Sequence, residues 1–172
     1  MWIISVALAL GLSILAPTAA MAFQNEPNGF RGIAWGTPLS AVQSQMRPVG
    51  ATPAGQDQAY VRVGDNMAIG GATLEKVLYK FHNGAFSEAF IVAQKGPSNA
   101  TALIAAFRAQ FGEGRRPHRS ADDYIWEGPT AIVFLTCHSG SHPCLAFLQS
   151  RLAFAQQNAE KAAAAAAARK DF

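Results

Sequence analysis

The dipeptide Asn83-Gly84 constrains the fold of this chain most, because it separates two runs in which apolar and polar residues alternate. In residues 73–82, Val77, Tyr79 and Phe81 recur at every second position, which is the period of a half-buried strand. Residues 85–94 form the second run. A two-residue hairpin turn needs positive φ at both positions, which Asn and Gly tolerate. The sequence therefore predicts an antiparallel hairpin over residues 73–94.

Two helices are predicted from their start signals. The first begins at Thr37-Pro38, because the Thr hydroxyl can cap a helix and Pro at the first helical position loses no needed donor. Its apolar positions at helical spacing are Leu39, Val42 and Met46. The second helix opens at Pro97 and Ser98, and Gly112 ends it. Residues 47–58, rich in Pro and Gly, are predicted to be an irregular loop.

Short runs rich in apolar residues predict further strands at 30–35, 60–63, 124–127, 130–137 and 144–150. Together with the hairpin, they give a helix and three strands over residues 37–94 and again over 98–150. This duplicated αβββ plan predicts an α+β fold, in which one antiparallel sheet buries one face under the two helices. The expected domain spans residues 23–150.

The first 22 residues are interpreted as a cleavable secretory signal. Residues 2–16 are apolar apart from one Gly and two Ser, which is too short to cross a bilayer comfortably. Pro17 then ends the helix, and Ala20-Met21-Ala22 supplies the small-x-small pattern for cleavage before Phe23. We therefore expect a periplasmic or secreted protein. Because the start of the chain has no Lys or Arg, an uncleaved membrane anchor stays open as an alternative.

Removal of the signal leaves about 150 residues, a length that suits one domain with one core. The formal net charge of +3 is too small to indicate nucleic-acid binding. After residue 150 the chain becomes rich in Ala, the residue with the best helix propensity. For residues 151–172 we expect a helix or tail that docks near Leu152 and Phe154 and is exposed beyond Gln157.

The segment from Cys137 to Cys144 is the cluster in the sequence whose side chains are most capable of forming a bond or binding a metal. After export, two nearby cysteines usually form a disulfide, which is the favoured interpretation. A weaker alternative is a metal site, for which His138 and His142 would complete a four-ligand set with the two thiolates. The spacing matches no common zinc pattern, and a redox-active pair would usually show Cys-x-x-Cys.

A basic loop is the second candidate site. It contains Arg115, Arg116, His118 and Arg119, which could contact an anionic partner such as phospholipid headgroups or an acidic protein surface. The competing interpretation is a solvated loop in which nearby Asp122 and Asp123 compensate the charge.

The remaining singled-out residues favour structural roles. Trp35, Tyr124 and Trp126 are predicted to lie in the core, since aromatics on short strands usually do. His82, next to the turn, is predicted to be exposed. The carboxylates are dispersed, and the common nucleophile, metalloprotease and phosphate-loop motifs are missing from the sequence. We therefore assign no catalytic residue and no cofactor, and a non-enzymatic role is favoured.

The segment 29–37, followed by a short helix, resembles the opening of a family of uncharacterised exported bacterial proteins. Its residues are Gly29, Phe30, Arg31, Gly32, Ile33, Ala34, Trp35, Gly36 and Thr37. Later matches are Tyr79-Lys80-Phe81, Phe111-Gly112, Tyr124 and Trp126. The resemblance covers most of the chain after the signal except the Ala-rich tail, and it brings no assigned catalytic residue.

The doubled αβββ plan is similar to β-lactamase-inhibitor-protein folds and to the small outer-membrane lipoprotein of the barrel-assembly machinery. Those proteins bind other proteins, so the similarity implies a binding role, although one fold hosts many functions. Our leading hypothesis is a periplasmic interaction module that binds an envelope protein or an anionic surface through its exposed sheet face or the basic loop. The alternatives are a metal-binding protein and a small-ligand binder or hydrolase with its site between sheet and helices.

Overall fold

The computed structural model describes residues 23–50, 57–118, 122–138 and 142–169. The predicted signal, residues 1–22, and Arg119 of the basic loop lie outside the described residues. The described chain combines three α-helices with an eight-stranded, antiparallel sheet, which confirms the α+β class.

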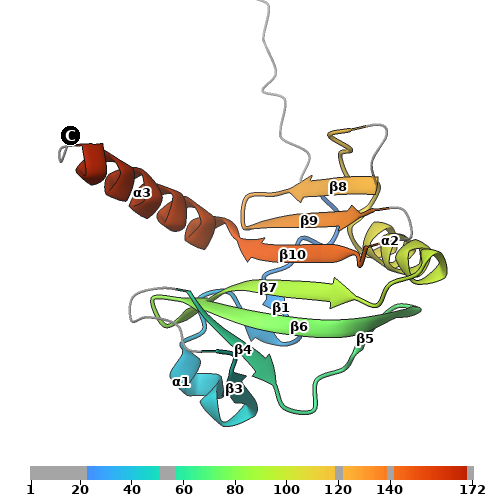
Figure 1. Ribbon diagram of the computed structural model, residues 1–172, viewed down its shortest axis with the longest axis horizontal. Coiled ribbons are helices and arrows are strands. Elements are labelled where there is room, and N and C mark those ends of the chain that lie inside the picture. The colour runs from blue at the N-terminus through green and yellow to red at the C-terminus, as the bar shows by residue number, and fades with distance from the viewer. Residues whose placement is uncertain (1–22, 51–56, 119–121, 139–141, 170–172) are drawn as a thin grey trace, which may run out of the picture.

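The main sheet joins two sets of three strands at its middle (Figure 1). The first set is β4 (Gln58–Arg62), β6 (Ala72–His82) and β7 (Ala85–Ala93), and the second is β8 (Asp122–Glu127), β9 (Ala131–Cys137) and β10 (Leu145–Ser150). The order across the sheet is β3-β4-β6-β7-β10-β9-β8, so β7 and β10, the last strand of each set, pair with one another. Two short strands extend the first set, namely β3 (Met46–Pro48) and β5 (Ala68–Ile69).

The β6–β7 hairpin forms as predicted. Asn83 and Gly84 have φ of 50° and 79°, which is the positive-φ pair that a tight two-residue turn requires. Tyr79 lies opposite Ala89, and both side chains are fully buried. The alternation in the sequence therefore identified the buried face of the sheet correctly.

The first helix is much shorter than predicted. Only α1 (Leu39–Val42) is α-helical, and a turn of 3-10 helix (Gln43–Gln45) follows it. The prediction that the helix continues to Met46 was wrong, because Met46 begins β3 and pairs with Arg62. The pairing with β4 explains the difference, because it draws the backbone of Met46 to Pro48 into an antiparallel ladder. The same strand shows that residues 47–58 are not irregular throughout.

Residues 30–35 form a tight hairpin and not the single strand that their alternation predicts. The two strands are β1 (Gly29–Phe30) and β2 (Ile33–Ala34), and they pair antiparallel. Between them, Arg31 and Gly32 have φ of 48° and 80°, so the chain reverses within two residues. This β1–β2 hairpin lies against the core, to which Ile33 contributes a buried side chain and Phe30 a partly buried one.

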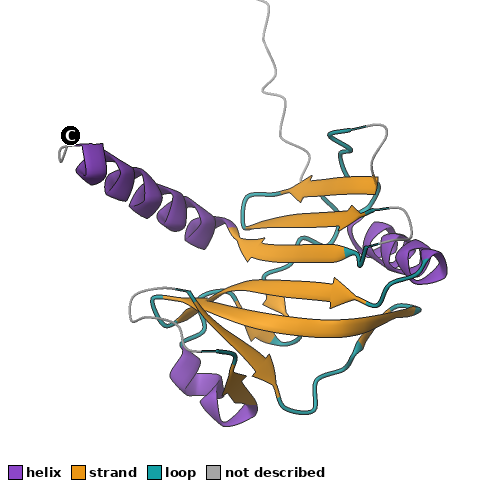
Figure 2. Cartoon of the chain, in the orientation of Figure 1, coloured by secondary structure: helices purple, strands orange, loops and turns teal. Residues whose placement is uncertain are grey.

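One face of the main sheet is covered by α2 (Pro97–Phe111) and by the β1–β2 hairpin (Figure 2). Leu103, Phe107 and Phe111 of α2 are buried on the side of the helix that faces the sheet. Because α1 is a single turn, the hairpin takes the place that a full first helix was expected to fill over the sheet. The opposite face is more open, and at one end of it the first turns of α3 border a groove together with Phe134 and Phe147.

The C-terminal helix α3 (Arg151–Ala168) projects from the end of β10 (Figure 1). The Ser150 side chain caps it by accepting a hydrogen bond from the Ala153 amide. Its predicted docking residues were wrong, since Leu152 and Phe154 are 69% and 40% exposed, whereas Ala153 and Gln157 are buried. Beyond Gln157 the helix is exposed up to residue 169, as expected. No helix in the described ranges is both long and apolar enough to cross a membrane.

Candidate functional site

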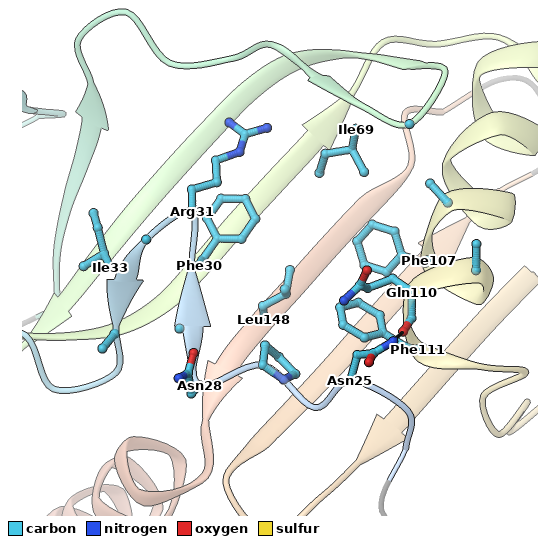
Figure 3. A pocket seen from close by; sticks show the side chains of 17 residues that line it. Asn25, Asn28, Phe30, Arg31, Ile33, Ile69, Phe107, Gln110, Phe111 and Leu148 are labelled. Carbon is cyan, nitrogen blue, oxygen red and sulfur yellow. Dashed lines mark hydrogen bonds between the residues drawn. The ribbon is translucent and has the colours of Figure 1, made fainter.

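A cleft of about 860 Å³ opens between the β1–β2 hairpin and α2, on the covered side of the sheet (Figure 3). We refer to it below as the cleft. Its size lies within the range typical of small-molecule sites, roughly 300 to 1,000 Å³. The β1–β2 hairpin and α2 form its two walls.

Apolar side chains from four parts of the fold line the cleft. They are Phe30 and Ile33 on the hairpin, Ile69 on β5, Leu148 on β10, and Phe107 and Phe111 on α2. In Figure 3 Leu148 lies between the two walls, with Phe30 on one side and the two α2 phenylalanines on the other. The contact surface offered to a ligand is therefore mainly hydrocarbon.

The hairpin wall is fixed by a partly buried polar network at its turn. The Arg31 guanidinium donates through Nη1 to Asp65 Oδ1 at 2.7 Å and through Nη2 to the Ala68 carbonyl at 3.0 Å. The Tyr79 hydroxyl donates to the other oxygen of Asp65 at 2.9 Å. Arg62 in turn donates to the Arg31 carbonyl at 3.1 Å. Charge-assisted bonds of this kind hold the turn rigidly against the sheet.

This network also determines the electrostatics of the cleft. Arg31 is the charged residue among the described lining residues, and its side chain is 17% exposed. Its partner Asp65 is 8% exposed, so the two opposite charges cancel at the wall. Burial, and then the hydrogen bond to Asp65, raise the pKa of Tyr79 to about 12, which keeps its phenol neutral. The cleft therefore presents no net charge to a ligand.

Residues 23–28, which precede the hairpin, contact α2 and the start of β9 and form part of the rim of the cleft. Phe23 packs edge-on against Phe111, with ring centroids 5.6 Å apart. The Asn25 amide donates to the Gln110 carbonyl at 2.9 Å, which joins this segment to α2. A carboxylate oxygen of Glu26 accepts the backbone amides of Thr130 and Ala131, each at 2.7 Å.

The polar groups at the rim are the side-chain amides of Asn25, Asn28 and Gln110 (Figure 3). Amides can donate and accept hydrogen bonds, but they are neither acids nor bases near neutral pH. The described lining residues include no carboxylate, histidine, cysteine or serine. The arrangement is suited to binding, and its described groups supply no nucleophile or proton-transfer pair.

The predicted disulfide is present, because Cys137 and Cys144 are joined across the β9–β10 connection. Both residues are buried, and the rings of His138 and His142 lie 6.1 Å apart. With the two sulfurs bonded to one another, the thiolate pair that the metal alternative requires is not available. Within the described ranges, no cluster of three or more His, Cys, Asp or Glu could hold a metal ion.

The basic loop is largely compensated. Arg115 pairs with Glu127 at 3.0 Å, and Arg116 pairs with Asp122 at 3.2 Å and lies over the Tyr124 ring. His118 is exposed. Arg115 also exchanges two backbone hydrogen bonds with Ile125, so it partly covers the outer edge of β8. These pairs favour the interpretation of a solvated loop over a dedicated anion site.

Two of the three singled-out aromatic residues lie in the core, as predicted, and Trp35 is partly buried against it. Tyr124 and Trp126 are buried. Trp35 stacks on Phe86 with ring centroids 5.1 Å apart, and its indole N–H donates to the Pro27 carbonyl at 2.9 Å. All three stabilise the core under the hairpin and α2.

His82 differs from the prediction, which placed it as an exposed turn residue. It is 7% exposed, with Nδ1 2.7 Å from Asp57 and Nε2 3.2 Å from Glu160 of α3. Burial lowers the pKa of His82, but the hydrogen bonds and charges of the two carboxylates outweigh it and raise the pKa overall. Gln157 adds bonds to Asp57 and Gln149, so this cluster attaches α3 to the sheet.

Sequence reasoning offered a ligand site between the sheet and the helices as an alternative, but it missed the β1–β2 hairpin that forms one wall of the cleft. Phe30 and Arg31 lie in the segment that carries the family resemblance, but their alternation suggested a strand and gave no sign of a wall. The pairing of Arg31 with Asp65 spans 34 positions, and no local pattern reports it. The one usable signal was Gly32, which marks a reversal when it follows another residue that accepts positive φ.

Comparisons of this chain with protein families, with curated proteins and with solved structures found no match.

Proposed function

We propose that this protein is an exported binding module that holds a neutral, apolar ligand in the cleft between the β1–β2 hairpin and α2. The observation that carries the proposal is the combination of a hydrocarbon lining with a wall charge that is already cancelled by Asp65. Apolar ligands gain roughly 25 cal/mol for each Å² that leaves water, so such a cleft favours a hydrocarbon chain or ring.

The neutrality of the ligand follows from Arg31. Two of its nitrogens are already bonded to Asp65 and to the Ala68 carbonyl, so an anionic group would have to compete with a buried carboxylate. A cationic group would have no unpaired carboxylate among the described lining residues. The rim amides of Asn25, Asn28 and Gln110 offer hydrogen bonds to a hydroxyl or amide on the ligand.

The disulfide and the apolar first 22 residues support the proposal of export. Disulfides persist in the periplasm and outside the cell and are rare in the cytosol. A neutral hydrophobic molecule needs a carrier in such an aqueous compartment, because its free concentration there is limited by the hydrophobic effect.

The test is competition against a neutral fluorescent probe, N-phenyl-1-naphthylamine, by three ligands with the same ten-carbon chain. They are decanol, decanoate and decyltrimethylammonium, which carry neutral, negative and positive head groups. Decanol is expected to displace the probe most effectively. A preference of more than about tenfold for decanoate would contradict the account, because it would mean that Arg31 is available to anions.

A matched pair of variants locates the binding. Ala109 lines the cleft on α2, whereas Ala105, one turn earlier on the same helix, is exposed and does not line it. Ala109→Trp is expected to fill the cleft and weaken decanol binding at least tenfold, and Ala105→Trp is expected to leave binding unchanged. Equal effects of the two variants, or none from Ala109→Trp, would place the ligand elsewhere.

A further inference from the structure

The uncovered face of the sheet has an ordered layout across β6, β7, β10, β9 and β8. Strand registers place three cross-strand rows on this face, and in each row the residues are direct partners. The middle row is entirely apolar: Leu78, Phe90, Phe147, Phe134 and Ile125. The row on one side is Lys76, Val92, Leu145, Thr136 and Asp123, and the row on the other is Lys80, Glu88, Gln149, Ile132 and Glu127.

The middle row is an apolar stripe that the described chain leaves partly exposed. Phe90 and Phe147 pack with ring centroids 4.7 Å apart, and Phe134 follows at 6.3 Å from Phe147. At one end of the face, Phe154 of α3 borders a groove of about 690 Å³ above these rings. Contiguous apolar surface of this kind on a soluble domain usually marks an interface.

The ends of the two outer rows lie at equal distances from β10, the central strand of the five, and carry opposite charges. Both outer rows begin with lysine on β6 and end with a carboxylate on β8. A two-fold rotation about an axis along β10 exchanges β6 with β8 and β7 with β9 between two copies. Lys76 then faces Asp123 of the second copy, Lys80 faces Glu127, Phe90 faces Phe134, and Phe147 faces itself.

We propose that two copies of this protein associate face to face through this surface, about a two-fold axis along β10. Such an interface is isologous, since the same patch on each copy meets itself. Sheets that pack face to face lie about 10 Å apart and cross at about 30°, a distance that interleaved aromatic side chains fill. The flexible lysine side chains span the offset that the crossing angle introduces at the ends of the rows.

Lys76 and Asp123 are the decisive charged pair. Lys80 and Glu127 already have partners within one copy, namely Glu88 at 2.6 Å and Arg115 at 3.0 Å. Lys76 is exposed, and Asp123 accepts a hydrogen bond from the Thr136 hydroxyl; within the described chain neither has an ion pair. Four strand spacings, about 19 Å, separate them in one copy, so they can meet only between copies.

The dimer is independent of the proposed ligand site. The cleft lies on the opposite, covered side of the sheet, so both clefts of the pair face outward (Figures 1 and 3). Because β10 runs along the axis, the two α3 helices leave the pair at the same end. The test below therefore reads association alone and does not depend on whether the cleft binds a ligand.

The test is sedimentation equilibrium on Lys76→Glu and Asp123→Lys, measured separately and as an equimolar mixture. In either homodimer, each substitution makes two attractive contacts repulsive, which is expected to weaken association roughly tenfold or more. In the mixed dimer both contacts are again between opposite charges, so the mixture is expected to recover the wild-type affinity. Lys95→Glu, an exposed lysine outside the face, is the charge-matched control and is expected to change nothing.

Near-UV circular dichroism checks that each variant keeps the native packing. Should Asp123→Lys fail this check, Asp123→Asn replaces it, because a neutral partner still removes the repulsion from Lys76→Glu in the mixture. A wild-type chain that stays monomeric up to about 0.1 mM would overturn the proposal. So would a dimer that is insensitive to both reversals, or a mixture of folded variants that does not recover.

Discussion

Arg31 determines two features of the cleft wall, namely the turn of the β1–β2 hairpin and the cancelled charge beside it. Its φ of 48° turns the hairpin, and its guanidinium fixes that turn to Asp65. The same ion pair neutralises Arg31, which is the one charged residue among the described residues that line the cleft. The fold of the hairpin and the charge of the cleft wall are thus coupled at one residue, and the sequence around it contains no sign of the partner 34 positions away.

His82 links α3 to the hairpin turn and gives the fold a pH dependence. Its pKa is raised in the folded chain above the ordinary value of 6.5, because Asp57 and Glu160 stabilise the protonated ring more than burial disfavours it. A raised folded pKa contributes stability that is complete below pH 6.5 and is lost as pH rises through the folded pKa.

We therefore expect the urea midpoint of the wild-type protein to fall as pH rises above 6.5. In His82→Gln this part of the pH dependence should disappear, whereas His118→Gln, which changes an exposed histidine, should keep it. Urea denaturation followed between pH 6 and 9 measures the difference. Parallel pH profiles for the wild type and His82→Gln would show that the cluster does not favour the protonated ring.

At the scale of elements, the long strands and α2 could be predicted from the sequence, and the short elements could not. The β6–β7 hairpin and α2 have strong periodicity and clear boundary residues at Asn83-Gly84, Pro97 and Gly112. By contrast, α1 is only one turn long, and the chain soon after it pairs with β4 as strand β3. Short segments take their structure from tertiary contacts, which local pattern does not report.

The end of the chain shows the same limit. Helix propensity predicted α3, but its buried residues are Ala153 and Gln157 and not the larger Leu152 and Phe154. The polar cluster around His82, with Gln157 bonded to both Gln149 and Asp57, decides how the helix is oriented. Hydrophobicity alone therefore selects the wrong face of this helix.

The disulfide that links β9 and β10 is expected to contribute to the free energy of unfolding. Closing the eight-residue segment from Cys137 to Cys144 is expected to stabilise the fold by roughly 2 to 3 kcal/mol, since it lowers the entropy of the unfolded chain. Urea unfolding with and without reductant measures this difference in free energy. The double variant Cys137→Ser/Cys144→Ser should not respond to reductant, and equal free energies for the oxidised and reduced wild type would contradict the estimate.

For the whole molecule, the sheet separates two surfaces with different properties. One face carries the core, α2, the β1–β2 hairpin and the cleft. The other face presents an apolar stripe between two rows, each of which has a lysine at one end and a carboxylate at the other. The duplicated αβββ plan predicted both the single sheet and its one covered face. It offered a site between sheet and helices, but it did not predict that a β-hairpin forms one wall of the cleft. It also did not predict the cross-strand rows, because these depend on the exact strand register.

The measurement that tests the central claim most directly is a titration of the methyl-labelled protein with decanol, followed by nuclear magnetic resonance. The methyl groups of Ile33, Ile69 and Leu148 line the cleft, whereas those of Leu78, Ile125 and Ile132 lie on the opposite face. We predict saturable shifts at the first three, lost in Ala109→Trp, and little change at the others. Shifts confined to the opposite face, or none that saturate, would contradict the cleft as the binding site.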